Sequence, residues 1–290
     1  MPTLSPTTSL NRLRQAVARS PALPELSGLH YARTHAAYEA ASDQRAGLQA
    51  WLPRQLPPLL DAGPPHGGEP LRVLGVGVGD GSVDAPLADA LAAQGRRVRY
   101  TGIEPHAMSA AGFVVRLAAL PADSLTVTAV AGEFADHEAA VPADLVHFVH
   151  SLYYMADLGA TLDHALAMLR PGGLLVTATA PRHPLCVLTE LLSPGNGHRL
   201  WCAEDVTAEL LARRLKVRSE TMVAELDLRG LLIDPHGAGE PLLDFLVGAG
   251  TSTMAVEVRE LVMAYLAEVA LPGRSGVVPH PIDITITRVP

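Results

Sequence analysis

The stretch that decides the fold is LRVLGVGVGDG, residues 71–81. It begins as a short apolar run typical of a buried strand, and glycines then alternate at Gly75, Gly77, Gly79 and Gly81. Glycines at this place let the backbone turn sharply and approach a ligand closely. A helix is expected to follow at 83–94, and its first turn offers unpaired N–H groups. The stretch therefore predicts a strand, a ligand-binding turn and a helix.

Strand-like and helical segments alternate on the carboxyl side of this stretch. Such alternation predicts an α/β fold with a doubly wound, mostly parallel sheet. The strictly alternating segment 282–289 is expected to pair antiparallel with 216–226 at one edge, which completes a seven-stranded sheet. The strands expected before them are 71–78, 97–104, 124–131, 144–150 and 174–180, and the helices between them are 83–94, 106–119 and 158–169.

The remaining segments predict a helical cap around this core. Helical spacing covers 7–19 and 32–52, and the prolines Pro53, Pro57 and Pro58 are expected to end the second helix and begin a linker that reaches residue 70. Further helices are expected at 203–214, 241–248 and 254–270. The expected organisation is an N-terminal helical cap and linker (1–70), a cofactor-binding core (71–182), cap insertions (183–202 and 230–276) and segments that complete the sheet (203–229 and 277–290).

Composition excludes several classes of partner. The 290 residues carry a formal net charge of −8, which disfavours nucleic acids and anionic membranes. No apolar run reaches the ~18 residues of a membrane span. Two cysteines without a CxxC pair favour a reducing, cytoplasmic location. The 12 histidines lack ligand spacing, so no metal site is expected. We expect a monomer with a small-molecule or short-peptide substrate.

Glu104 stands 23 residues after Gly81, at the end of the second expected strand. A carboxylate there can accept hydrogen bonds from both ribose hydroxyls of a nucleoside cofactor. The glycines follow one another at every second residue and do not meet the GxGxxG register of dinucleotide sites. The pattern therefore favours an adenosine-containing cofactor other than NAD, and an NAD-dependent oxidoreductase is kept as a remote alternative.

These features together resemble a class I methyltransferase: GxGxG after the first strand, an acid that ends the second, and Pro-Gly-Gly before the fifth. The resemblance covers 71–180 and implies S-adenosyl-L-methionine as cofactor, with S-adenosyl-L-homocysteine as product. Two further runs, HFVHSLYYMADLGATLDHALAML (147–169) and ELDLRGLLIDPHGAGEPLLDFL (225–246), are similar to the histamine N-methyltransferase family. We therefore expect an enzyme of this type.

The resemblance implies roles for individual residues. Its cofactor contacts fall on Gly75, Gly77, Gly79, Gly81, Glu104, Pro105, Ser109, Glu133, Phe134 and Val149. Its acceptor contacts fall on or near Tyr31, His35, Tyr38, Asp43, Gln44, Tyr153, Tyr154, His198, Trp201, Phe245 and His280. Where the family holds an ammonium with a glutamate, this sequence has Gln44, with Asp43 beside it. Histamine itself is thus disfavoured as the acceptor.

His150 is the candidate catalytic residue. It ends a central strand, at the edge where open α/β sheets bind their ligands. Histidine titrates near neutral pH and can act as a general base, although a structural histidine at a loop is the alternative. His147, three residues earlier, is expected to face the other side of the sheet. We expect methyl transfer to a nitrogen of an imidazole or amine; transfer to a carboxylate or hydroxyl oxygen of a natural product or peptide is the alternative, and a binding domain without catalysis is a third possibility.

Overall fold

The structure is a computed structural model that describes residues 8–26, 28–63, 68–121, 123–138, 140–193 and 200–290. The chain divides into two compact units, which are described separately. Unit 1 contains the residues up to Gln44, Arg182–Leu200 and Val223–Pro281; unit 2 contains Arg45–Pro181, Trp201–Met222 and Ile282–Pro290. This division differs from the expected cap of residues 1–70, because residues from Arg45 onward belong to the unit that holds the large sheet.

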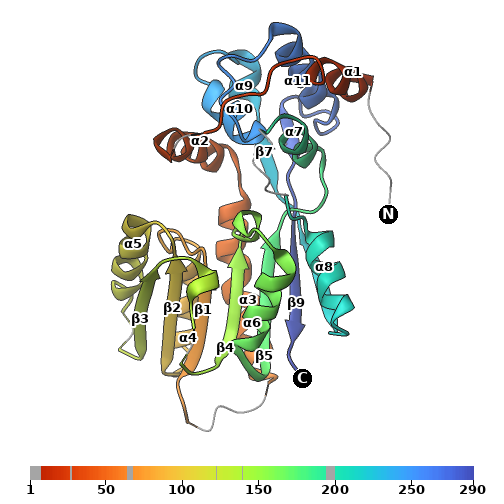
Figure 1. Ribbon diagram of the computed structural model, residues 1–290. Coiled ribbons are helices and arrows are strands. Elements are labelled where there is room, and N and C mark those ends of the chain that lie inside the picture. Colours follow the sequence, from red (N-terminus) through yellow and green to blue (C-terminus); the bar gives the residue numbers. More distant parts are fainter. Residues whose placement is uncertain (1–7, 27, 64–67, 122, 139, 194–199) are drawn as a thin grey trace. The chain divides into compact units, whose positions relative to one another are not determined.

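Unit 2 is built on a seven-stranded sheet with the order β3-β2-β1-β4-β5-β9-β6 (Figure 1). The first five strands pair in parallel, and β9 is antiparallel to both of its neighbours. The predicted fold class and the antiparallel pairing at the edge are therefore confirmed. The strands are β1 (Leu71–Val76), β2 (Val98–Glu104), β3 (Leu125–Ala131), β4 (Ala143–Val149), β5 (Leu169–Thr179), β6 (Val217–Met222) and β9 (Ile282–Arg288).

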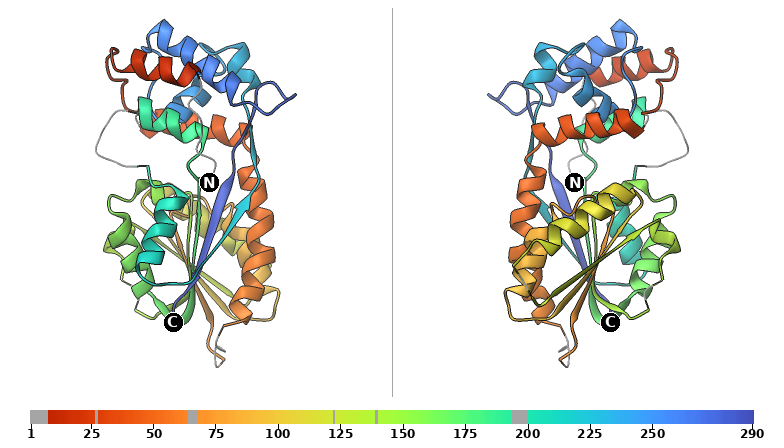
Figure 2. Two further views of the ribbon diagram at one scale, coloured as in Figure 1. Left: turned by 90° about the vertical axis from the view of Figure 1, so that its right-hand side faces the viewer. Right: turned by 90° about the vertical axis from the view of Figure 1, so that its left-hand side faces the viewer.

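Helices cover both faces of this sheet (Figure 2). Alternate strand residues point to opposite faces, so Val73 belongs to an apolar core that includes residues of α3, α4 and α5, whereas Leu74 belongs to one that includes residues of α6 and α8. Both faces are apolar, as expected for a sheet buried on both sides. The helices are α3 (Gln44–Asp61), α4 (Asp84–Ala92), α5 (Ala107–Ala118), α6 (Leu158–Ala167) and α8 (Ala203–Ala212), with short 3-10 turns at Phe134–Asp136 and Leu152–Tyr154.

The expected helix break at the prolines is wrong. Helix α3 contains Pro53, Pro57 and Pro58 and ends only at Asp61. Each internal proline removes a backbone hydrogen bond and costs about 3 kcal/mol. Leucines at positions 48, 52, 56 and 60 lie on one face and are at most 3% exposed. Each buried leucine contributes about 1.5–3 kcal/mol, so their packing offsets the prolines.

The helical break lies instead between α2 (Gly28–Ala41) and α3, within the helix that the sequence predicts at 32–52. Ser42 forms an isolated antiparallel bridge with Leu226. The backbone N–H of Asp43 donates to Glu225 O at 3.3 Å, and its carboxylate accepts the Glu225 N–H at 2.7 Å. The expected single helix is therefore divided by a local strand-like pairing inside unit 1.

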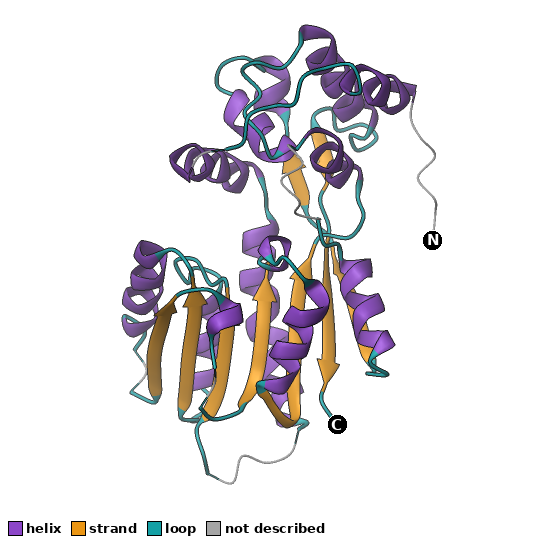
Figure 3. Ribbon diagram, viewed as in Figure 1, coloured by secondary structure: helices purple, strands orange, loops and turns teal. Residues whose placement is uncertain are grey.

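The segment 216–226 is not one strand. It forms β6 in the large sheet and then β7 (Glu225–Asp227), which pairs with β8 (Val277–Pro279) in a separate two-stranded sheet of unit 1 (Figure 3). The helices of unit 1 bury their own apolar core, which does not include strands of the large sheet. They are α1 (Thr8–Val17), α2, α7 (Pro184–Leu192), α9 (Arg229–Ile233), α10 (Glu240–Val247) and α11 (Val256–Glu268).

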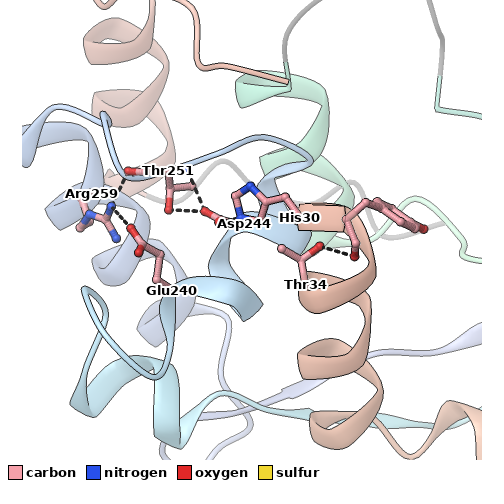
Figure 4. Close-up of polar contacts among 7 residues, drawn as sticks. His30, Thr34, Glu240, Asp244, Thr251 and Arg259 are labelled. Carbon is pink, nitrogen blue, oxygen red and sulfur yellow. Dashed lines mark hydrogen bonds and ion pairs between the residues drawn. The ribbon is translucent and has the colours of Figure 1, made fainter. Parts of the chain in front are cut away.

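A buried polar network joins three helices of unit 1 (Figure 4). Asp244 on α10 is 3% exposed and accepts hydrogen bonds from the Thr251 N–H at 2.7 Å and the Thr251 hydroxyl at 2.6 Å. Its other oxygen lies 2.7 Å from His30 Nε2 on α2. Arg259 on α11 donates to the Thr251 carbonyl at 2.5 Å and lies 3.7 Å from Glu240. The network satisfies polar groups that helix packing has removed from water.

Replacing Asp244 with alanine should strongly destabilise unit 1. The change leaves the Thr251 N–H, its hydroxyl and the His30 ring without their shared acceptor, and removing one partner from a buried charged network costs about 3–5 kcal/mol. Urea unfolding should show this loss in the free energy of unfolding. The control is Asp234→Ala, because Asp234 is exposed and caps a single backbone N–H at 2.9 Å. Equal losses in both variants would contradict the role of the network.

Candidate functional site

The glycine turn leaves β1 in a conformation that only glycine adopts easily. Gly77, Gly79 and Gly81 have φ values of +68°, +55° and +76°, in the left-handed region. A Cβ on Gly77 would collide with Ser151, which stands directly behind it. A Cβ on Gly79 would meet nothing within 4 Å. The turn is therefore packed tightly on one side, while Gly79 has open space beside it.

Glu104 ends β2 next to this open space. Its Oε2 accepts the Gly79 N–H at 3.0 Å, and its Oε1 accepts the His106 N–H at 3.0 Å. Each carboxylate oxygen keeps a further lone pair, so both can still accept a hydroxyl hydrogen. The site thus offers paired acceptors beside a glycine-lined cradle, which fits the ribose of a nucleoside cofactor.

The residues after Glu104 start α5. Pro105 leads into His106, whose ring nitrogen Nδ1 accepts the Ser109 N–H at 3.4 Å and lies 3.1 Å from the Ser109 hydroxyl. Ser109 therefore serves as a partner of the helix cap. On the other side of the loop, Asp80 accepts the Ser82 N–H at 3.0 Å and pairs with Arg116 at 2.6 Å. Partial burial alone would raise the pKa of Asp80, but these hydrogen bonds hold it below its usual value.

The last three residues predicted as cofactor contacts have different surroundings. Glu133 is exposed before the first 3-10 turn. Phe134 is 3% exposed, and its ring packs edge-on against Phe148 at 5.3 Å, so it belongs mainly to the core. Val149 is half-buried at the end of β4. These positions are close to the ends of β3 and β4.

His150 follows β4 and has φ +53°, a left-handed conformation that is uncommon for residues with a side chain. Its N–H donates to Ala178 O at 3.0 Å, which fixes it beside the end of β5. Its Nδ1 lies 3.3 Å from the Tyr153 hydroxyl, and that oxygen accepts the Ala180 N–H at 2.5 Å. The contact with Tyr153 orients the His150 ring, whereas the side chain of Tyr154 is 61% exposed. Backbone strain of the kind seen at His150 is concentrated at functional sites.

Sequence reasoning missed Ser151. This residue is 4% exposed, and its hydroxyl donates to Val76 O at 2.6 Å. It closes the back of the glycine turn by contact with Gly77, as described above. The signal in the sequence is a small polar residue two positions after the end of β4, the strand next to β1.

Several acceptor-side candidates gather in unit 1. The Tyr38 ring stacks on Phe245 with centroids 4.2 Å apart, and the Tyr31 and His35 rings lie within 6.2 Å of the same phenylalanine. Tyr38 donates to Gln44 Oε1 at 2.6 Å, so the Nε2–H of His280, 2.8 Å away, must donate to the Tyr38 oxygen. These residues, with Gln44, form what we call the aromatic cluster: Tyr31, His35, Tyr38, Gln44, Phe245 and His280.

Three other candidates lie apart from the aromatic cluster. Asp43 is exposed and binds the Glu225 backbone. Trp201 belongs to unit 2, where its indole N–H donates to Met155 O at 2.7 Å. His198 lies outside the described residues. The acceptor contacts that the resemblance implies are thus divided between the two units.

The helices in the described part of the chain include none long and apolar enough to cross a membrane. Among the same described residues, the histidines, cysteines and carboxylates include no group of three placed to hold a metal ion.

Comparisons with known proteins agree with this geometry. The chain is 26% identical over 191 residues to histamine N-methyltransferase B of Xenopus laevis, a match that covers 61% of this chain. It spans 65% of that relative's length, and the same share of histamine N-methyltransferase A from the same species.

Two solved structures share the fold. The plantazolicin methyltransferase BpumL, solved in complex with SAH, has a TM-score of 0.51 and 11% identity, and the match covers 97% of this chain and 96% of that one. A protein of Bacillus halodurans assigned as a methyltransferase has a TM-score of 0.52 and 14% identity, with coverage of 82% and 99%. The fold is therefore the Rossmann-like fold of class I methyltransferases.

Residues 42–217, more than half of the chain, match the family described as "Methyltransferase domain". This range contains the glycine turn, Glu104 and His150. The cofactor of this family is S-adenosylmethionine, and the open side of Gly79 beside the Glu104 carboxylate fits its ribose. The chain belongs to the methyltransferase domain family.

Proposed function

We propose that this chain transfers a methyl group from S-adenosylmethionine to a nitrogen atom of a small acceptor. The observation that carries the proposal is the pairing of Glu104 with the Gly79 N–H inside a glycine turn of the methyltransferase domain family. The preference for nitrogen is supported by the relatives, which are named histamine N-methyltransferases. Their 26% identity supports the reaction class more strongly than the acceptor.

The cofactor supplies an electrophilic methyl group on a sulfonium. The task of the protein is then to hold donor and acceptor in line, and such alignment can contribute about 7–11 kcal/mol to lowering the barrier. In this chain the glycine turn and Glu104 fix the nucleoside part. Ser151 keeps the turn in place through its bond to Val76 O.

His150 is the proposed group that handles the acceptor's proton. If its Nδ1–H donates to the Tyr153 oxygen, Nε2 carries the lone pair and can accept a proton. Tyr153 is itself held by the Ala180 N–H, so the ring has a fixed orientation. A base held in this way contributes roughly 10²–10⁴-fold to the rate.

We assign the acceptor contacts to the aromatic cluster, which favours a flat and uncharged acceptor. The two residues at the family's ammonium-binding position already have partners in unit 1. Gln44 is 3% exposed and binds both Tyr38 and the His280 carbonyl, and Asp43 binds the Glu225 backbone. A neutral imidazole fits this set better than a primary ammonium. Because no acid at this position is assigned to bind an ammonium, the second candidate is methylation of a hydroxyl or carboxylate oxygen.

Two measurements test the proposal in order. A thermal shift should appear with S-adenosylmethionine and S-adenosylhomocysteine, and a shift with NAD alone would refute the cofactor assignment. An acceptor screen of imidazoles, amines, carboxylates and phenols, read by product mass, should then give methylation of imidazoles before the others. Methylation of carboxylates or phenols alone would replace the nitrogen acceptor with an oxygen acceptor.

A further inference from the structure

A buried polar trio lies against the glycine turn and has no part in the proposed reaction. It comprises Asp84 of α4, Tyr100 of β2 and His147 of β4, which are 4%, 0% and 2% exposed. The Tyr100 oxygen lies 2.8 Å from Asp84 Oδ1 and 2.8 Å from His147 Nε2. Three elements that meet around the cofactor site are therefore joined by the Tyr100 hydroxyl group, and His147 Nε2 also lies 3.3 Å from Asp84 Oδ1.

The trio holds both ends of the glycine turn. At the β1 end, a Cβ on Gly75 would stand 2.9 Å from His147 Nε2, so the imidazole fills the space that a side chain would take. At the helix end, Asp84 is the first residue of α4, and the Ala85 N–H beside it donates to Gly81 O at 2.9 Å. The Tyr100 hydroxyl connects these two anchors.

Hydrogen positions follow from the geometry. Tyr100 has one hydroxyl hydrogen, which it donates to Asp84 Oδ1. The short contact to His147 is then satisfied only if His147 Nε2–H donates to the Tyr100 oxygen. His147 Nδ1 is left with its lone pair, and it has no hydrogen-bond partner among the described residues. The chain of donors therefore runs from His147 through Tyr100 to Asp84.

Burial sets the charge of the trio. It raises the pKa of Asp84 to about 7, despite the hydrogen bond from Tyr100, and it lowers the pKa of His147 to about 4. Asp80, in the loop before α4, also raises the pKa of Asp84 through its charge, and Asp80 is paired with Arg116 of α5. Asp84 and His147 are both uncharged in mildly acidic solution, and Asp84 ionises near neutral pH.

We propose that the Tyr100 hydroxyl is a positioning group for the cofactor loop, because it fixes the Asp84 end of the glycine turn to the His147 end. Ionisation of Asp84 makes the Tyr100 bond charge-assisted and therefore stronger. Cofactor affinity should then rise as Asp84 loses its proton. The inference rests on the cofactor site and not on the identity of the acceptor.

The trio itself gives global stability little pH dependence, which helps the test. Between about pH 4 and 6.5 the unfolded pair holds one proton, on histidine, and the folded pair also holds one, on Asp84. Equal proton numbers give no slope of stability with pH. From about pH 6.5 to 7 only the folded state keeps that proton, so stability falls slightly as pH rises. A cofactor affinity that rises over this range is therefore not a by-product of the trio's own effect on stability.

The test is calorimetric binding of S-adenosylhomocysteine to the full chain at pH 6 and pH 8. Tyr100→Phe should weaken binding about tenfold at pH 6, as expected for a lost hydrogen bond near ~1.4 kcal/mol, and about thirtyfold at pH 8, where the lost bond is also charge-assisted. Wild-type affinity should rise about threefold from pH 6 to pH 8, because the Tyr100 bond to the ionised Asp84 is charge-assisted. Asp84→Asn keeps an acceptor for Tyr100 but cannot ionise, so its affinity should stay constant over this range.

Tyr265→Phe is the matched control. Tyr265 of unit 1 is also buried, at 2% exposed, and its hydroxyl donates to Pro184 O at 2.9 Å. This variant should lose stability but keep wild-type affinity and its pH dependence. If folded Tyr100→Phe binds S-adenosylhomocysteine as the wild type does at both pH values, the trio is only structural and the proposal is wrong. Failure of the wild type to bind would instead refute the cofactor site itself.

Discussion

Glu104→Ala should lower the affinity for S-adenosylhomocysteine by at least about 100-fold. The carboxylate accepts the Gly79 and His106 N–H groups and is proposed to accept both ribose hydroxyls as well. Hydrogen bonds to a charged group contribute about 1.5–3 kcal/mol each, so the loss of two gives this magnitude. Isothermal titration calorimetry measures the change directly, and no methylation assay is needed.

Two comparisons make this result specific. Glu104→Gln keeps one acceptor oxygen but places an NH₂ group against a backbone N–H, so we expect a loss close to that of alanine. Glu138→Ala removes an exposed glutamate beyond the first 3-10 turn and should leave affinity unchanged. A folded Glu104→Ala protein that binds within about threefold of the wild type would contradict the assignment, since two lost bonds to a charged group predict far more.

His150→Gly should lower turnover by roughly 10²–10⁴-fold, the contribution of a general base. Glycine is informative here because the residue sits at φ +53°. The substitution relieves the strain, so stability should not fall, and any loss of activity comes from the missing imidazole. Product mass against time gives turnover, while calorimetry with S-adenosylhomocysteine should show a nearly unchanged affinity.

Two control variants test whether the loss of turnover comes from the His150 imidazole itself. His150→Asn keeps a residue that tolerates the left-handed conformation but lacks the basic nitrogen, so it should be as inactive as the glycine variant. His236→Ala removes an exposed histidine of unit 1 and should be fully active. Normal turnover in His150→Gly would remove the base role and leave His150 as a structural residue.

The sequence predicts the sheet and the cofactor turn because their signals are local and agree with one another. Glycine spacing, the strand before it and Glu104 after the next strand all point to the same arrangement. The parallel pairing of β1 with β2 then places the carboxylate beside the turn without any contribution from distant residues. The position of His150 at the edge of the sheet follows from the same regular pattern.

Helix α3 shows why other predictions fail. Pro53, Pro57 and Pro58 are strong local signals for a break, whereas the leucines at every fourth position are a signal for burial. The free energy gained by burying these leucines depends on the sheet against which they pack, and a single sequence does not show that surface. The outcome therefore depends on tertiary packing, which outweighs local preference.

The polar groups are the least predictable part. Asp244 and Asp84 look like surface helix residues, yet both are buried, and their partners include His30 for Asp244 and His147 for Asp84, far away in the sequence. The left-handed conformation of His150 also has no local signal. Such features depend on which side chains the fold brings together, so they appear only in three dimensions.

The position of β9 has a consequence for how the chain acquires its fold. Residues 282–288 pair with both β5 and β6, although the whole segment 180–281 lies between β5 and β9 in the sequence. Contacts over such sequence separations slow folding, because a large loop must close before the pairing is gained. Until β9 is inserted, β5 presents an open edge, which is a template for intermolecular pairing. Synthesis halted before residue 282 should therefore give a product that aggregates.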